Sequence, residues 1–306
     1  MKFAVILLFL QLSPAAETQK YQEIDEVLNK TYNHSRQLSA DKEAEAMARI
    51  LLEKYPDDPY VYNLWASLEW LLIGRELNLR ADEQKDIREV NGYKERVQRY
   101  RDTVNNGLTL TENTKDERSL FLRSALKFDH AKFSARYESK YSGLKRADKE
   151  AGEGIQILRE ILKANPSFCS AYLFLGGNRL QLSTKTSLYQ RPFIWGFSGV
   201  YSEIYSINTD VFNEQKSIEW LEISYRCHYS HPWMKKGWLE TNFLLIGAYR
   251  DYGKKLNPRD EIPVLKKEVP LLKQLTAMFP QNQDIAKMLS ERELRLKTLE
   301  NYFSKR

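Results

Sequence analysis

The stretch AEAMARILLEKYPDDP, Ala44–Pro59, decides the fold class of this chain. Its apolar residues recur every three or four positions, which is the spacing of one face of an amphipathic helix. Pro56 and Pro59 cannot continue that helix, and Asp58 is suited to cap a new helix that opens at Tyr60. The stretch therefore predicts two successive helices joined by a short proline-containing turn.

The same arrangement occurs at two later places in the chain. An apolar-faced segment over 155–162 runs into a turn at Pro166, and another over 271–278 runs into a turn at Pro280. A polar residue follows each proline, and a further helical pattern then begins. Repetition of helix, proline turn and helix is typical of helical repeat architectures.

Four segments share a second pattern: an aromatic residue, a packing residue three positions later, a small residue directly after it, and a larger residue three positions further on. The aromatic and small residues of the four segments are Tyr62 and Ala66, Phe121 and Ala125, Tyr172 and Gly176, and Phe243 and Gly247. Both residues lie on one helix face. We expect a neighbouring helix to approach each small residue closely while the ring fills the space beside it.

These segments resemble the tetratricopeptide repeat (TPR), whose first helix carries aromatic-x-x-Leu-Gly-x-x-Tyr and whose second helix ends in proline. Two segments match the first helix, namely Tyr172, Leu175 and Gly176, and then Phe243, Ile246 and Gly247. Three segments match the second helix, namely Ala44 with Pro56, then Gly154, Leu158 and Ile161 with Pro166, and then Leu272 and Leu275 with Pro280. The layout is also similar to that of uncharacterised exported bacterial TPR-repeat proteins. The resemblance covers nearly the whole chain after the N-terminal leader and implies stacked helix pairs.

The spacing of the repeats departs from the TPR standard. The first-helix segments lie about 50–70 residues apart, whereas the standard period is about 34. We therefore expect elongated helices, including a prolonged one over 126–141 and a charged one over 81–106 with Val90, Val97, Tyr100 and Val104 as a sparse inner stripe. The repeat pattern is interrupted by an aromatic-rich insertion over about 183–210. The predicted fold class is an all-α, irregular TPR-like helical-hairpin solenoid that forms a single domain over 17–306.

Residues 1–16 have the layout of a secretory signal peptide. Lys2 precedes an apolar run over 3–12, and small residues then allow cleavage after Ala15 or Ala16. The alternative is a membrane anchor, but a helix of this length reaches only about 15 Å, half of the hydrocarbon core. We therefore predict an exported protein, periplasmic or extracellular, with no integral membrane segment after cleavage.

Charge and cysteine content restrict the partners only in part. The net charge of +6 comes from 47 basic and 41 acidic residues interspersed along the chain. Nucleic-acid-binding proteins usually concentrate their basic residues on one face, so we expect no nucleic-acid partner.

Cys169 and Cys227 are the two cysteines. An oxidising compartment permits a disulfide between them, and separate burial of two thiols is the alternative.

The insertion carries the candidate binding residues. They are four aromatic residues and an arginine, namely Tyr189, Arg191, Phe193, Trp195 and Phe197. Long insertions in compact folds are often functional, and aromatic residues with arginine are common anchors of binding surfaces. The competing interpretation, which we favour slightly, is that these rings fold back and fill the inner face of the array, because exposed rings are costly.

The sequence offers no catalytic motif, metal site or cofactor motif. Cys227, His228 and His231 form a compact cluster of metal-capable side chains, but a zinc site needs three or four ligands at suitable spacing. We interpret these histidines as a helix end favoured by the helix dipole. Asp129 and His130 are interpreted as a solvent-facing pair, because no nucleophile pattern accompanies them.

The leading functional hypothesis is a non-catalytic scaffold of the cell envelope that binds a protein or peptide on a concave surface. One alternative is a small-molecule-binding protein or enzyme with a pocket between the 183–210 insertion and the concave repeat face, lined by Arg179, Arg250 or His228. Another alternative is a structural envelope component in an oligomer. That alternative requires an apolar patch on the last helix, near Leu289, Leu294 and Leu296.

Overall fold

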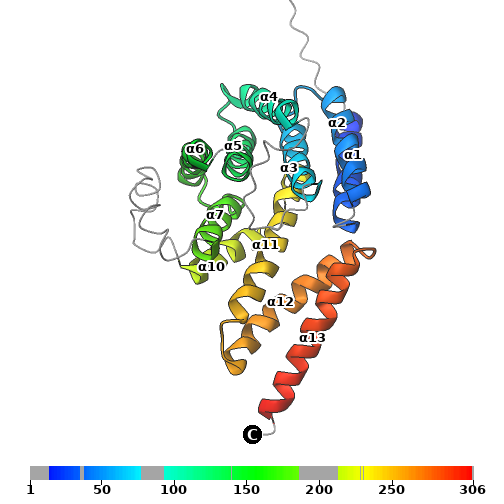
Figure 1. Ribbon diagram of the computed structural model, residues 1–306, viewed down its shortest axis with the longest axis vertical. Coiled ribbons are helices and arrows are strands. Elements are labelled where there is room, and N and C mark those ends of the chain that lie inside the picture. The colour runs from blue at the N-terminus through cyan, green and yellow to red at the C-terminus, as the bar shows by residue number, and fades with distance from the viewer. Residues whose placement is uncertain are drawn as a thin grey trace, which may run out of the picture.

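A computed structural model describes residues 14–34, 38–76, 93–138, 140–185, 213–227, 229 and 231–304. Over these residues the chain is all-helical and contains no β-strand (Figure 1). The all-α prediction is therefore confirmed. Residues 1–13 of the predicted signal peptide and nearly all of the aromatic insertion lie outside the described residues, as do all five candidate binding residues.

Neighbouring helices in the sequence pack against one another. The helices are α1 (Pro14–Asn33), α2 (Leu38–Lys54), α3 (Pro59–Glu76), α4 (Tyr93–Thr111), α5 (Glu117–Tyr137), α6 (Lys140–Ala164), α7 (Ala171–Lys185), α10 (Glu214–Arg226), α11 (Lys235–Gly253), α12 (Pro258–Met278) and α13 (Gln283–Ser304), with a short 3-10 helix η2 (Pro232–Met234) before α11. The pairs α1–α2, α3–α4, α5–α6, α7–α10, α11–α12 and α12–α13 are all in contact. None of the described helices is long and apolar enough to cross a membrane.

The proline turns lie where the sequence predicts them. Helix α2 ends at Lys54 and α3 begins at Pro59, and the Asp58 carboxylate accepts a hydrogen bond of 3.0 Å from the Tyr60 backbone N–H. This bond satisfies a donor that the first turn of a helix leaves unpaired. The later turn at Pro280 ends in the same way, because the Asn282 side chain accepts from the backbone N–H of Ile285 at 3.1 Å.

The small residues of the repeated pattern do not all have the expected role. Ala66 and Ala125 are fully buried, and a Cβ placed on Gly176 would lie 2.9 Å from the Leu221 side chain of α10. By contrast, a Cβ on Gly247 would have no neighbour within 4 Å. The expectation of a close helix approach is therefore wrong at Gly247. In α11 the pattern begins about two turns after the start of the helix, whereas in α7 it begins in the first turn.

This difference predicts opposite effects for one substitution at two sites. Gly176→Ala should destabilise the protein by roughly 1 kcal/mol, because overpacking against α10 outweighs the better helix propensity of alanine. Gly247→Ala should stabilise it by about 0.5–1 kcal/mol, because only the propensity gain remains. Urea unfolding monitored by circular dichroism measures both changes in stability. Equal shifts of the two unfolding curves in the same direction would contradict the observed packing.

Both predicted long helices end at residues other than expected. The helix predicted over 81–106 continues to Thr111 as α4, which is described from Tyr93, and Val97, Tyr100 and Val104 of its inner stripe are buried as expected. Residues 81–92, with Val90, lie outside the described residues. The helix predicted over 126–141 ends earlier, at Tyr137. There, Glu138 adopts an extended backbone, and its carboxylate pairs with Arg101 of α4 at 2.6 Å. The spacing of apolar residues along one helix does not indicate an ion pair with another helix.

Tight packing explains why the chain turns back after Tyr137. Helices α5 and α6 form the most extensive helix pair of the described fold. A Cβ on Gly143 would clash with the carbonyl oxygen of Ser134, so only glycine allows α6 to cross the last turns of α5 at this distance. The prolonged helix is therefore two helices that fold onto each other.

The disulfide left open by the sequence is present. Cys169, just before α7, and Cys227, at the end of α10, are bonded, and their Cα atoms lie 5.8 Å apart. This separation is typical of disulfides. The bond joins the base of the α7–α10 hairpin, whose two helices are already in extensive contact.

Candidate functional site

Three helices contribute polar side chains to one partly buried region, in which the charges of Lys132 and Glu240 act on each other. Asn63 and Ser67 come from α3, Asp129 and Lys132 from α5, and Lys236 and Glu240 from α11. Within each helix the two residues are three or four positions apart, which places them on a common face. We call these six residues the inner polar cluster.

Asp129 is the centre of hydrogen bonding in the cluster. Its carboxylate accepts bonds from Asn63 Nδ2 at 2.8 Å and Ser67 Oγ at 3.1 Å, and it lies 3.3 Å from Lys132 Nζ. The Asp129 side chain is only 4% exposed. A buried carboxylate is costly unless it is paired and hydrogen-bonded, so these three partners account for its position.

Helix α11 adds a second ion pair, between Lys236 and Glu240 at 2.9 Å. Burial opposes ionisation of the Glu240 carboxyl, but Lys236 and Lys132 outweigh it and hold its pKa below the ordinary value. Burial also acts against the charged form of Lys132, yet the charges of Asp129 and Glu240 raise its pKa above the ordinary value. Both groups are therefore ionised at neutral pH, with positive and negative charges facing one another.

The cluster combines fixed and accessible groups. Asp129 and Lys236 are nearly inaccessible, whereas the side chains of Lys132 and Glu240 keep 34% and 23% of their accessible surface. The partly exposed side chains of Lys132 and Glu240, held by buried partners, can bind polar and charged groups of a second molecule. No group of three or more His, Cys, Asp or Glu side chains in the described parts of the chain could hold a metal ion.

The interpretation of Asp129 and His130 as a solvent-facing pair is wrong. Both residues are buried, because α5 is covered by α3 on one side and by α6 on another. Asp129 faces α3, while His130 Nδ1 lies 3.6 Å from Glu150 Oε1 of α6. Burial lowers the pKa of His130, even though the charge of Glu150 acts in the opposite direction. Two adjacent polar residues on a helix thus serve two different interfaces.

The residues proposed for a pocket beside the insertion have separate surroundings. The Arg179 guanidinium lies 4.9 Å above the Trp220 ring of α10. Arg250 lies 3.5 Å from Asp251, and its charge also acts on Glu268 of α12. His228 lies outside the described residues, as do Tyr189, Arg191, Phe193, Trp195 and Phe197 of the insertion.

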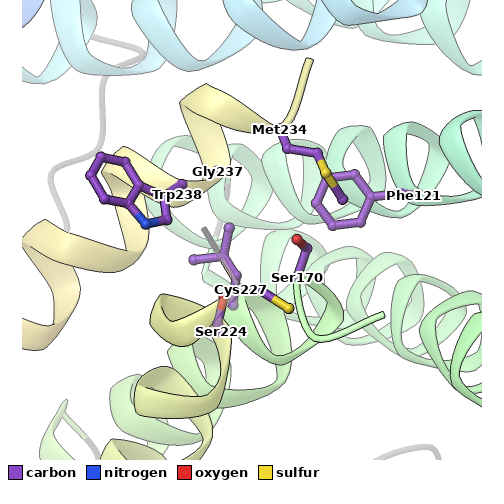
Figure 2. A pocket seen from close by; sticks show the side chains of 8 residues that line it. Phe121, Ser170, Ser224, Cys227, Met234, Gly237 and Trp238 are labelled. Atoms are coloured by element: carbon purple, nitrogen blue, oxygen red, sulfur yellow. The ribbon is translucent and has the colours of Figure 1, made fainter. Parts of the chain in front are cut away.

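A small enclosed cavity lies between α5, α7, α10 and α11. Figure 2 shows Phe121, Ser170, Ser224 and Trp238 around it, together with Cys227 of the disulfide. Its volume is about 10 Å³, which corresponds to about one water molecule. The serine hydroxyls can bind such a water, but the cavity is too small for a substrate.

A second buried ionic group, distinct from the inner polar cluster, joins α1, α3 and α5. The Asp58 carboxylate, which caps α3, also pairs with Lys20 of α1 at 2.7 Å and with Arg118 at 2.6 Å. Burial raises the pKa of Asp58, but Arg118 and Lys20 outweigh it and hold the pKa below its ordinary value. This group stabilises the contact between the first three helix pairs.

The lowered pKa of Asp58 predicts a specific loss of stability in acid. The folded state binds the proton less tightly than the unfolded state, so the ionised carboxyl stabilises the fold above about pH 4, and this contribution is lost as the pH falls further. Asp58→Asn should lower the free energy of unfolding at pH 7 by about 1–3 kcal/mol. Urea unfolding from pH 3 to pH 7 should show the two proteins converging in acid; parallel profiles would contradict the assignment.

Comparison with known proteins identifies no relative of this chain. No protein-family model matches it, and neither does any curated protein or solved structure.

Proposed function

We propose that the chain is a non-catalytic, TPR-like helical-hairpin scaffold that binds a protein or peptide partner in the cell envelope. The observation that carries this proposal is the inner polar cluster, in which the partly exposed side chains of Lys132 and Glu240 lie beside the buried Asp129 and Lys236. Stacked helix pairs present their first helices on one side, and such surfaces suit extended or helical peptides.

The order of helix contacts supports a repeat arrangement. Among the described helices, five pairs are in contact in chain order, namely α1–α2, α3–α4, α5–α6, α7–α10 and α11–α12, and α13 packs on the last of them. First helices of successive hairpins also touch, as in the contacts of α3 with α5 and of α7 with α11. Within the fourth hairpin, Gly176 packs against Leu221, which is the close approach that the TPR pattern requires.

The composition of the cluster suits a peptide rather than a substrate that undergoes chemistry. A peptide presents backbone donors and acceptors together with charged side chains, and the cluster offers an amide, a hydroxyl and charges of both signs. The hydrogen bonds donated by Asn63, Ser67 and Lys132 all converge on the Asp129 carboxylate, so these side chains are held together as one polar group.

Export is part of the same proposal. The disulfide between Cys169 and Cys227 supports an oxidising compartment, because such bonds persist mainly in exported proteins. Together with the leader-like residues 1–16, it favours a periplasmic or extracellular location.

The oligomer alternative has less support. Leu289 and Leu296 are half-buried, and Leu294 is 67% exposed between charged residues, Glu293 and Arg295. A single exposed leucine is ordinary on a protein surface and does not make an apolar patch.

In-cell crosslinking followed by affinity capture tests the proposal. Lys132→Ala should reduce recovery of the crosslinked partner about tenfold, because an accessible charge-assisted contact is lost. Trp195→Ala tests the aromatic insertion as a second binding surface, and Lys266→Ala removes an exposed lysine of α12 that is paired with Glu300 of α13, as the matched control. Equal recovery from Lys132→Ala and Lys266→Ala, with both proteins folded, would refute binding at the cluster.

A further inference from the structure

An open groove lies between the second half of α1 and the first half of α2. Its volume is about 290 Å³, which is close to the lower end of the range for ligand-binding clefts, about 300 Å³. Among the described residues, its polar lining consists of Glu26, Asn29, Lys30, Asn33, His34 and Glu43, and Met47 adds an apolar side chain. We call this site the α1–α2 groove. It shares no residue with the inner polar cluster.

Two carboxylates, one on each helix, give the groove its negative charge. Glu43 of α2 forms an ion pair with Lys30 of α1, and 60% of the Glu43 side chain and 32% of the Lys30 side chain are exposed. Glu26 lies one turn before Lys30 on the same face of α1, is exposed, and makes no hydrogen bond or ion pair within the described part of the chain. The groove therefore has one unpaired carboxylate and a second one whose ion pair is weakened by water.

The turn between α12 and α13 holds the end of α1 that borders the groove. The Gln281 N–H donates a hydrogen bond of 3.4 Å to Asn33 Oδ1, and Asn282 Nδ2 donates one of 2.6 Å to the Tyr32 carbonyl oxygen. Figure 1 shows this turn beside the end of α1. The α1 side of the groove is therefore fixed before a ligand binds, which lowers the entropic cost of binding.

Met47 gives the groove an apolar wall. Its side chain is half-buried and packs against the core, and a thioether adapts its shape to a neighbouring apolar group. A ligand that fits this groove therefore needs an apolar stem as well as a positively charged head. An arginine side chain has both, and its planar guanidinium carries five N–H donors that can meet carboxylates on two sides. The lysine ammonium is a point charge without this planar arrangement of donors.

We propose that the α1–α2 groove binds an arginine side chain of the protein or peptide partner. The stem of the arginine lies along Met47, and its guanidinium lies between Glu26 and Glu43, where it replaces Lys30 as the partner of Glu43. This inference rests on the proposed function, because it specifies part of the chemistry of that partner. The groove is separate from the inner polar cluster, so binding at each can be tested without the other.

Methionine-methyl NMR measures binding at the groove itself. The protein is isotopically labelled at its methionine methyl groups, and the Met47 signal is assigned by its loss in Met47→Leu. The probe is the blocked tripeptide acetyl-Gly-Arg-Gly-amide, which should shift the Met47 signal and saturate it in the millimolar range. The matched probe has citrulline in place of arginine, which keeps the shape and removes the charge, and it should bind at least about fivefold more weakly.

Substitutions at three surface positions test the charges without disturbing the core. Glu26→Gln should weaken binding of the arginine tripeptide about threefold to fivefold, because the unpaired carboxylate is lost. Lys30→Ala should strengthen binding about threefold, because Glu43 loses its present partner and becomes available to the guanidinium. The matched control, Lys266→Ala, removes the same charge from an exposed ion pair with Glu300 and should leave the affinity unchanged.

Equal affinities for the arginine and citrulline tripeptides overturn the proposal, as do equal affinities of the Lys30→Ala and Lys266→Ala proteins. Binding of free butylguanidinium without binding of the arginine tripeptide also overturns it, because the groove then takes a small molecule and not a side chain of a polypeptide. Each of these results, with crosslinking capture still dependent on Lys132, leaves the proposed function standing. Loss of the Lys132 dependence, with the groove results as expected, refutes binding at the inner polar cluster alone.

Discussion

Replacement of Asp129 by alanine is expected to lower the free energy of unfolding by about 3 kcal/mol. The substitution removes the carboxylate that Asn63 and Ser67 share and leaves the buried Asn63 amide without this acceptor. Lys132 also loses its nearest negative charge, although its partial exposure to water limits that contribution. The cost is therefore dominated by the unsatisfied amide.

Urea unfolding of the variant measures this cost, with Asp102→Ala as the matched control. Asp102 lies on the exposed side of α4 and bonds only to Gln98 among its described contacts, so its loss should change stability by less than about 0.5 kcal/mol. A double-mutant cycle with Asn63→Ala should give a coupling of about 1–2 kcal/mol. Additive effects would show that the two side chains do not interact in solution.

Helix type and turn position could be predicted because they depend on local chemistry. The two prolines and Asp58 specify a helix end and a cap within a few residues, and the structure contains both. The spacing of Val97, Tyr100 and Val104 likewise predicted which side of α4 is buried. Each of these features depends on steric limits and periodicity along a single helix.

The features that could not be predicted depend on a second helix. Gly176 and Gly247 occupy equivalent positions in the repeated pattern, but α10 lies against Gly176, whereas a Cβ on Gly247 would have no neighbour within 4 Å. Helix α5 ends at Tyr137, where Glu138 pairs with Arg101 of α4 and Gly143 of α6 packs on Ser134, and neither contact can be read from the local sequence.

The inner polar cluster escaped prediction for the same reason. From the sequence alone, Asp129 resembles an exposed helix residue, because its partners Asn63 and Ser67 lie on α3. The remaining cluster residues, Lys236 and Glu240, lie on α11, more than 100 positions later in the chain. A usable signal did exist, since Asn63 and Ser67 are polar residues four positions apart in an otherwise apolar helix. Such a pair on a buried helix predicts a buried polar partner.

Removal of the disulfide is expected to have an effect of similar or greater size. Cys169 and Cys227 are separated by 58 positions, and closing a loop of this length restricts the unfolded chain by about 4 kcal/mol in the chain-entropy description. The variant with both cysteines changed to serine should therefore unfold at much lower urea concentration than the oxidised protein. Its slope against denaturant should increase, because the unfolded chain becomes more expanded.

The native helices should survive this change, because the bond lies at the base of a hairpin that is already packed. Gly176 contacts Leu221, and Ser224 is hydrogen-bonded to Thr241 of α11 at 3.2 Å, so α7 and α10 keep their neighbours without it. Circular dichroism of the reduced wild-type protein should match that of the oxidised protein, and the double-serine variant should not respond to reductant. If reduction leaves the unfolding curve unchanged, the bond contributes nothing to stability. If reduction abolishes the helical signal, the packing between α7 and α10 requires the bond, which would contradict the expected survival of the helices.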